Sequence, residues 1–82
     1  MDKFGRAPLH VAAAANYGEM VEFLLTNGAD INLRTRGEEQ QPIHFAAKND
    51  AVMSLQVLIN FGADTTGKDY KGRTPLQVSE QK

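Results

Sequence analysis

Residues 5–32 of the chain read GRAPLHVAAAANYGEMVEFLLTNGADIN, and most of the remaining sequence is this stretch written again with substitutions. Pro8 returns as Pro42 and again as Pro75, at steps of 34 and 33 residues. The triplet Gly-Ala-Asp that begins at Gly28 returns at Gly62, again 34 residues later. A period of this size indicates stacked supersecondary units, because one unit alone cannot bury its own apolar face.

The pattern inside one unit predicts two short helices. Pro8 suits the first turn of a helix, where its missing N–H needs no partner, so we expect a helix over residues 9–15. Asn16 tolerates the left-handed backbone that ends such a helix. A second helix over residues 19–26 has apolar residues at helical period and is ended by Gly28. In that helix we expect Met20, Val21, Phe23, Leu24 and Leu25 to point inward and Glu19 and Glu22 to point outward.

The chain divides into two full units and a partial third within a single domain, 1–82. We place the first unit at residues 2–34, the second at 36–68 and the partial third at 69–82. The second unit departs from the pattern before its first helix. Glu39 stands where the other units have Gly5 and Gly72, and Gln41 stands where the third has Thr74, so we expect an irregular tip. Because such stacks usually need about three units, we also expect a piece of a longer array.

These motifs resemble those of the ankyrin repeat family. The resemblance rests on Thr74-Pro75-Leu76, Pro8-Leu9-His10, the paired alanines of each first helix and the two Gly-Ala-Asp triplets. It covers residues 2–79 and implies an all-α repeat solenoid of stacked helix-turn-helix units with β-hairpin loops. It also implies that His10 and His44, which share one repeat position, hydrogen-bond the neighbouring backbone as part of the scaffold.

Composition excludes several kinds of function. A formal net charge of −1 gives no general attraction to nucleic acid or membranes, and the longest apolar run, residues 11–15, is far too short to span a bilayer. The chain has no cysteine, which fits the cytoplasm or another reducing intracellular compartment. No nucleophile elbow, phosphate loop or metal-ligand spacing is present. We therefore expect neither catalysis nor a cofactor nor a bound metal.

Positions at which the repeats disagree point to partner binding, because the demands of the scaffold are the same in every unit. The ankyrin resemblance implies that partners bind a concave face of hairpin tips and first helices. By motif position this face holds Lys3, Phe4, Arg6, Gly37, Glu38, Gln40, Tyr70, Lys71, Arg73, Ala14, Ala15, Lys48, Asn49, Gln81, Lys82, Arg34 and Lys68. The set contains eight of the nine Lys and Arg residues and one acid, Glu38. Phe4 and Tyr70 add an aromatic residue to two of the tips.

We therefore predict a non-catalytic protein-interaction module that presents a rigid basic surface to an acidic partner segment. Alternatively, the cations only solvate exposed turns and each ring packs across the next hairpin. In that case the chain is a structural spacer within a larger channel, kinase or cytoskeletal adaptor protein. Nucleic-acid binding is a weaker hypothesis, because single-strand binders usually interleave several stacking aromatics and this face offers two.

Two further expectations concern modification and self-association. Asn32 follows Gly-Ala-Asp-Ile, and the ankyrin resemblance implies a substrate site for an asparaginyl hydroxylase, although Asn32 is equally suited to be a simple turn residue. The first unit has no polar capping unit before it, so we expect an apolar edge at Leu9, Val11 and residues 20–24. A second edge is expected at Leu58, Ile59 and Phe61, and both edges favour weak self-association.

Overall fold

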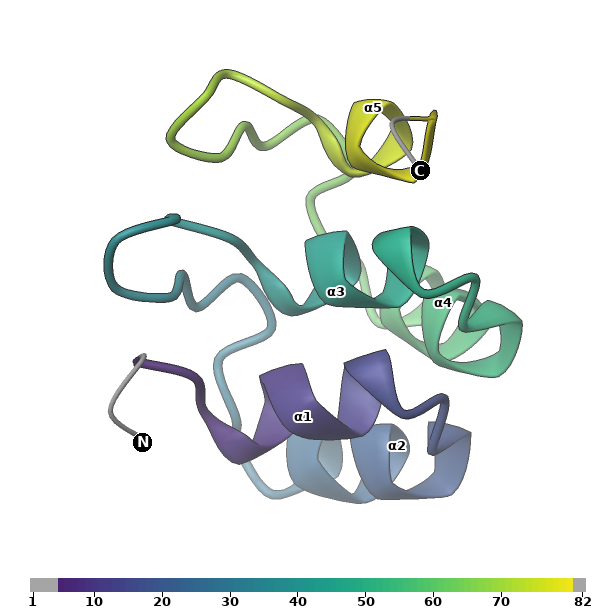
Figure 1. Ribbon diagram of the computed structural model, residues 1–82. Helices are drawn as coiled ribbons and strands as arrows, with labels where there is room; N and C mark the ends of the chain where they lie inside the picture. Colours follow the sequence, from purple (N-terminus) through teal and green to yellow (C-terminus); the bar gives the residue numbers. More distant parts are fainter. Residues whose placement is uncertain (1–4, 81–82) are drawn as a thin grey trace.

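The structure is a computed structural model that describes residues 5–80, and it is a stack of helix pairs (Figure 1). Within that range the elements are α1 (Pro8–Ala14), α2 (Gly18–Thr26), α3 (Pro42–Lys48), α4 (Val52–Asn60) and α5 (Pro75–Glu80). The first helices α1, α3 and α5 pack on one another in sequence, and α2 and α4 form a second layer beside them. The predicted all-α repeat solenoid is confirmed.

The long loops before α3 and α5 project from one side of the stack as hairpin-like tips (Figure 1). Thr35 N donates to Gln40 O at 2.9 Å, and Asp69 N donates to Arg73 O at 2.9 Å, so one backbone bond closes each tip. No strand forms anywhere in residues 5–80. The tips are joined to each other by the backbone N–H of Tyr70, which donates to Glu38 O at 2.9 Å.

Each first helix begins at its proline, one residue earlier than predicted for α1. His10 Nδ1 accepts the backbone N–H of Ala7 at 3.0 Å, and His44 Nδ1 accepts that of Gln41 at 3.1 Å. These histidines thus satisfy donors that the start of a helix would otherwise leave unpaired. In α5 a glutamine replaces the histidine, and its side-chain oxygen accepts the N–H of Thr74 at 2.9 Å.

Residues with positive φ end the helices, as the sequence predicts. Asn16 (φ 63°) follows α1 and Asp50 (φ 52°) follows α3, while Gly28 (φ 93°) follows α2. Ala29 N then donates to Leu24 O at 3.0 Å, which closes the helix end as a Schellman motif. Glu39 also adopts a left-handed conformation, with φ 55°, at the position where the other units have glycine.

The core lies between the two helix layers and is built largely from small residues. Ala13, Ala46 and Val21 are buried without exposed surface, and Ile43 and Leu58 fill the larger spaces beside them. Small side chains let neighbouring first helices approach closely. Each of these helices is only six or seven residues long, so it is held by its neighbours and not by its own propensity.

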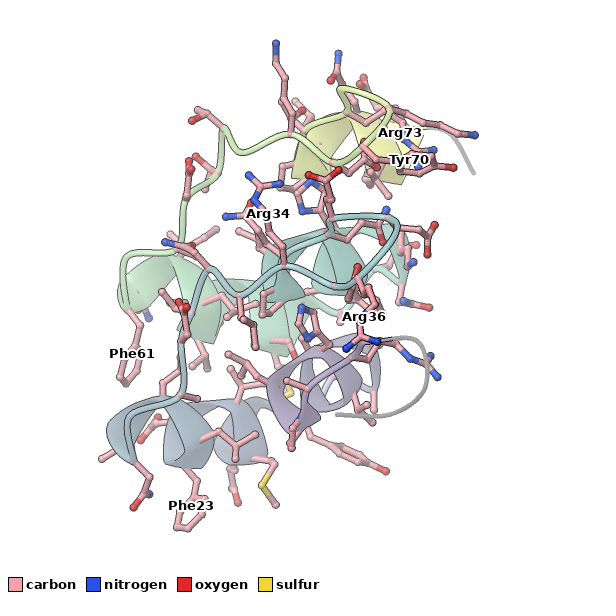
Figure 2. All side chains as sticks on the ribbon, turned by 90° about the vertical axis from the view of Figure 1, so that its left-hand side faces the viewer. Phe23, Arg34, Arg36, Phe61, Tyr70 and Arg73 are labelled. Carbon is pink, nitrogen blue, oxygen red and sulfur yellow. The ribbon has the colours of Figure 1, made fainter. Side chains whose placement is uncertain are left out.

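Two residues predicted to point inward do not do so. Met20 is 47% exposed and Phe23 is 61% exposed, and Figure 2 shows Phe23 projecting from the end of the stack. Val21 lies between them and is buried, because it faces α1 and α4 within the pair. The helical period of α2 is therefore correct, but its apolar stripe is wider than the surface that its neighbours cover.

Candidate interaction surface

The projecting tips and the arm between α2 and α3 form one side of the molecule, which faces the viewer in Figure 2. We call this side the tip face and define it by six described residues: Arg34, Arg36, Lys68, Tyr70, Lys71 and Arg73. Figure 2 labels four of them, Arg34, Arg36, Tyr70 and Arg73. The predicted contact residues Lys3 and Phe4 lie outside the described residues. Arg36 was missed by the sequence analysis, although it lies directly beside the irregular second tip.

Arg34 holds the tip face together. Its Nη1 donates to the carbonyl of Glu39 at 2.9 Å and also to the carbonyl of Lys68, which belongs to the next arm. A Cβ added at Gly67 would lie 3.1 Å from Arg34 Nη2 and 2.3 Å from Gln41 Oε1, so these side chains occupy the space that glycine leaves. Arg34 is exposed as predicted, but its guanidinium already links successive units.

Asp69 organises the third tip. Its Oδ1 accepts the backbone N–H groups of Lys71 (3.0 Å) and Arg73 (2.9 Å), which confirms it as a turn-forming residue. Its Oδ2 lies 2.9 Å from the guanidinium of Arg73. Burial alone would raise the pKa of Asp69, but hydrogen bonds from Arg73, Gln40 and Lys71 hold this pKa far below its ordinary value. The charge of Arg73 is thus balanced by an acid that the sequence analysis did not place on this face.

Gln40 does not present its side chain to a partner as predicted, because only 1% of the residue is exposed. Its Nε2 donates to Asp69 Oδ2 at 3.1 Å, and its Oε1 accepts from Lys48 Nζ at 3.0 Å. Gln40 therefore connects the second tip to the third tip and to α3. Repeat spacing could not reveal this role, because it depends on side chains from two other segments.

Lys48 and Glu38 line a cavity of about 210 Å³ between the first tip and α3. Arg6, Thr35 and Phe45 complete the lining, and we call this space the tip cavity. The ammonium of Lys48 lies 4.2 Å from the centroid of the Phe45 ring. Phe45 was assigned only to the helix, yet it stands where the first unit has Val11, and that difference between repeats was a usable signal.

The other predicted contact residues remain on the surface. Tyr70 is 51% exposed, and Lys71 Nζ lies 5.6 Å from the centroid of its ring. Lys68 and Lys71 are exposed, and neither forms an ion pair with any residue of the described range. Asn49 is exposed at the end of α3, where its Nδ2 donates to the carbonyl of Phe45 at 2.8 Å.

Both histidines are scaffold residues in the described structure. His10 Nε2 donates to the carbonyls of Leu33 (2.7 Å) and Gln40 (3.0 Å), and His44 Nε2 donates to that of Arg73 (3.0 Å). Because each Nδ1 accepts a backbone N–H, the neutral tautomer with a proton on Nε2 fits both sites. Burial is the largest influence on His44 and lowers its pKa below the ordinary value.

Asn32 is exposed on the arm but makes specific hydrogen bonds. Its Oδ1 accepts the backbone N–H of Asp64 at 3.1 Å and the side chain of Gln41 at 3.3 Å. Its own backbone N–H donates to Asp30 Oδ1 at 3.0 Å. The side chain thus joins two successive arms, in addition to the turn that the sequence predicts.

The two ends of the stack expose apolar side chains, although not all those predicted. Leu9 and Leu58 are buried, which corrects the expectation that they are uncovered. Val11, Met20 and Phe23 are exposed at one end. At the other end a cavity of about 280 Å³ is lined by side chains that include Val52, Leu55, Ile59 and Leu76.

Searches for two other kinds of site gave negative results for residues 5–80. No helix there is long and apolar enough to cross a membrane. That range also holds no group of three or more His, Asp or Glu side chains placed to bind a metal ion.

A family model described as "Ankyrin repeats (3 copies)" matches residues 9–82. The chain is 41% identical over 69 residues to "Ankyrin repeat and SOCS box protein 6" of Mus musculus, a match covering 83% of this chain and 16% of that protein. It is 34% identical over 82 residues to "E3 ubiquitin-protein ligase Ufd4" of Drosophila melanogaster, covering 100% of this chain and 3% of that protein. It is 30% identical over 78 residues to "BCL-6 corepressor-like protein 1" of Homo sapiens, covering 95% and 4%. The chain thus spans only a small part of each relative.

Proposed function

Because the chain belongs to the ankyrin repeat family, we propose that its tip face binds an acidic segment of a partner protein. Ankyrin repeats are in general non-catalytic modules that bind other proteins. The observation that supports an acidic partner is the group of exposed cations on the tip face. Arg36, Lys68 and Lys71 are exposed, and none of the three has an ion-pair partner within residues 5–80.

The mechanism would be binding to a preformed surface. Asp69 fixes the backbone of the third tip, and Arg34 fixes the arms behind it. Ordering of loops and side chains is a main cost of association, so a surface whose loops are already hydrogen-bonded loses less entropy on binding. Tyr70 would add apolar contact area next to the cations, a composition that is common at the energetic centre of interfaces.

The test uses a labelled peptide of alternating glutamate and serine, a neutral peptide with glutamine for glutamate, and fluorescence anisotropy. Lys68→Gln and Lys71→Gln should each weaken binding of the acidic peptide several-fold. Gln56→Glu on α4 is the matched control, because it also changes the net charge by one but lies away from the tips. Binding should weaken with added salt, since the Debye length falls from about 8 Å at physiological ionic strength to about 3 Å at 1 M.

The competing role is that of a structural spacer, in which the cations only solvate the turns. Equal affinity of the chain for the acidic and neutral peptides, or an effect of Gln56→Glu as large as that of Lys71→Gln, would favour the spacer. A single-stranded oligonucleotide of equal charge is a further control. Tighter binding of the oligonucleotide than of the peptide would contradict a protein partner.

We also propose weak self-association through the exposed ends of the stack. Met20 and Phe23 at one end would pack against Val52, Ile59 and Leu76 at the other end of a second copy. Burying about 400 Å² of apolar surface contributes on the order of 10 kcal/mol, against association costs of about 4 to 15 kcal/mol, so the net affinity is low. Sedimentation equilibrium should show dimers that Phe23→Gln removes, and a monomer up to millimolar concentration would contradict the proposal.

We further propose Asn32 as a substrate for an asparaginyl hydroxylase that adds one oxygen atom to the side chain. Its exposed place on the arm, after Gly-Ala-Asp-Ile, supports the proposal. Mass spectrometry after incubation with such an enzyme should find the added oxygen on Asn32, with Asn32→Thr as the control because Thr66 holds the same place in the second unit. An unmodified Asn32 would favour a purely structural residue.

A further inference from the structure

We infer that the tip cavity is an anchor subsite for one carboxylate side chain of the partner, an inference that rests on the interaction function proposed above. The cavity measures about 210 Å³, has Phe45 as an apolar wall and has Lys48 as a charged wall. The two walls come from one helix, α3, while the remaining lining comes from the first and second tips. A glutamate side chain would place its methylene groups against the ring and its carboxylate beside the ammonium.

Lys48 is a cation whose partners carry no opposite charge. Its Nζ lies 3.0 Å from the amide oxygen of Gln40 and 4.2 Å from the centroid of the Phe45 ring, and the side chain is half-buried. It forms no ion pair with any described residue. An ammonium has three donors, and the bond to Gln40 uses one of them. A carboxylate in the tip cavity would therefore form a charge-assisted hydrogen bond that the free protein lacks.

The position of Lys48 is set before any ligand binds. Gln40 holds the ammonium through Oε1 and is itself held by Asp69, which accepts from Gln40 Nε2 at 3.1 Å. Asp69 in turn is fixed by backbone N–H groups of its own tip. A lysine normally loses much rotamer freedom when it forms a contact, but this lysine is already ordered by its neighbours. The chain Asp69–Gln40–Lys48 is thus a positioning device for one charge.

Glu38 adds selectivity because it contributes a negative charge to the same cavity. It should repel an incoming carboxylate and reduce the affinity that Lys48 provides. The arrangement therefore predicts effects of opposite sign for two residues of one cavity. A general attraction between a basic surface and an acidic peptide would give no such pair, since loss of Lys71, which is outside the cavity, would matter as much as loss of Lys48.

The experiment is an NMR titration of the chain with the blocked tripeptide acetyl-Gly-Glu-Gly-amide, with acetyl-Gly-Gln-Gly-amide as the neutral control ligand. Resonances of Phe45 and Lys48 should shift with the glutamate peptide only. Lys48→Met should weaken binding by about tenfold, equivalent to about 1.4 kcal/mol. Glu38→Gln should strengthen it about threefold, and Lys71→Met should leave it unchanged within about twofold. The dispersion of the amide spectrum checks that each variant is folded.

The outcomes separate this inference from the proposed function. If Lys48→Met binds like the wild type while Lys71→Met binds more weakly, the tip face binds acidic ligands but the anchor subsite is refuted. If the folded wild type shows no difference between the two tripeptides, the anchor subsite is also refuted, and the longer acidic peptide then tests the tip face by itself. Should Lys48→Met fail to fold, an unchanged affinity in Glu38→Gln would refute the subsite.

Discussion

Asn16 should be the residue that couples the two helix pairs most directly. It ends α1 in a left-handed conformation, and its Oδ1 also accepts the backbone N–H groups of Met53 (2.9 Å) and Ser54 (3.1 Å) in the first turn of α4. The asparagine of one unit thus caps a helix of the next unit. Ala51, at the start of α4, provides no side-chain cap of its own, so Asn16 supplies the acceptor that this helix end needs.

Substitutions at Asn16 can separate its two contributions. Asn16→Gly keeps the left-handed backbone and removes the acceptor, which should cost about 1 kcal/mol, the typical value of a helix cap. Asn16→Ala also places a Cβ in the left-handed region, which costs about 1 kcal/mol more. The melting temperature should fall by about 4–8 °C for glycine and about 8–16 °C for alanine in a domain of this size. Asn16→Asp should be nearly neutral, because aspartate keeps the acceptor and Asp50 occupies the equivalent place.

Urea unfolding followed by circular dichroism measures these changes. Asn27→Ala is the matched control, since Asn27 bonds only to a carbonyl of its own helix, Phe23 O, at 2.8 Å. The control should change the free energy of unfolding by less than about 0.5 kcal/mol. If Asn16→Gly is as stable as the wild type while Asn16→Ala is not, the bond between units contributes nothing and only backbone strain matters. That result would refute the coupling role.

Three further predictions concern stability. Glu39→Gly should raise the melting temperature by a few degrees, because a left-handed glutamate costs about 1 kcal/mol and glycine does not; an unchanged or lower value in a thermal melt would contradict this. His44 has a lowered pKa when folded, so the unfolded chain binds more protons and stability should fall as pH drops below about 6.5; a His44→Gln variant should lose this dependence in urea midpoints measured against pH. Asp69 also has a lowered pKa, so a second loss of stability should begin below about pH 4, and Asp69→Asn should abolish it. Gly67→Ala should destabilise the chain by at least about 1 kcal/mol, because its Cβ would lie 2.3 Å from Gln41 Oε1, and a neutral substitution would show that Gln41 can move aside.

The sequence by itself determined the repeat, the helices and their ends. Pro8, Asn16 and Gly28 act through local backbone geometry, which depends only on the residue and its immediate neighbours. The same holds for Glu39, whose left-handed conformation follows from the glycine that the other units have in its place. For this reason the elements were predicted almost to the residue.

The side chains of the tip face were decided by tertiary structure, because their partners lie in other units. Gln40 and Arg34 were predicted to meet a partner, yet Gln40 is buried against Asp69 and Arg34 bridges two arms. Period and motif give the place of a residue within its unit, but a contact across about 30 residues of sequence depends on how the units stack. The exposure of Phe23 was decided in the same way: helical period shows which residues share a stripe, and only the neighbouring helices determine how much of that stripe is covered.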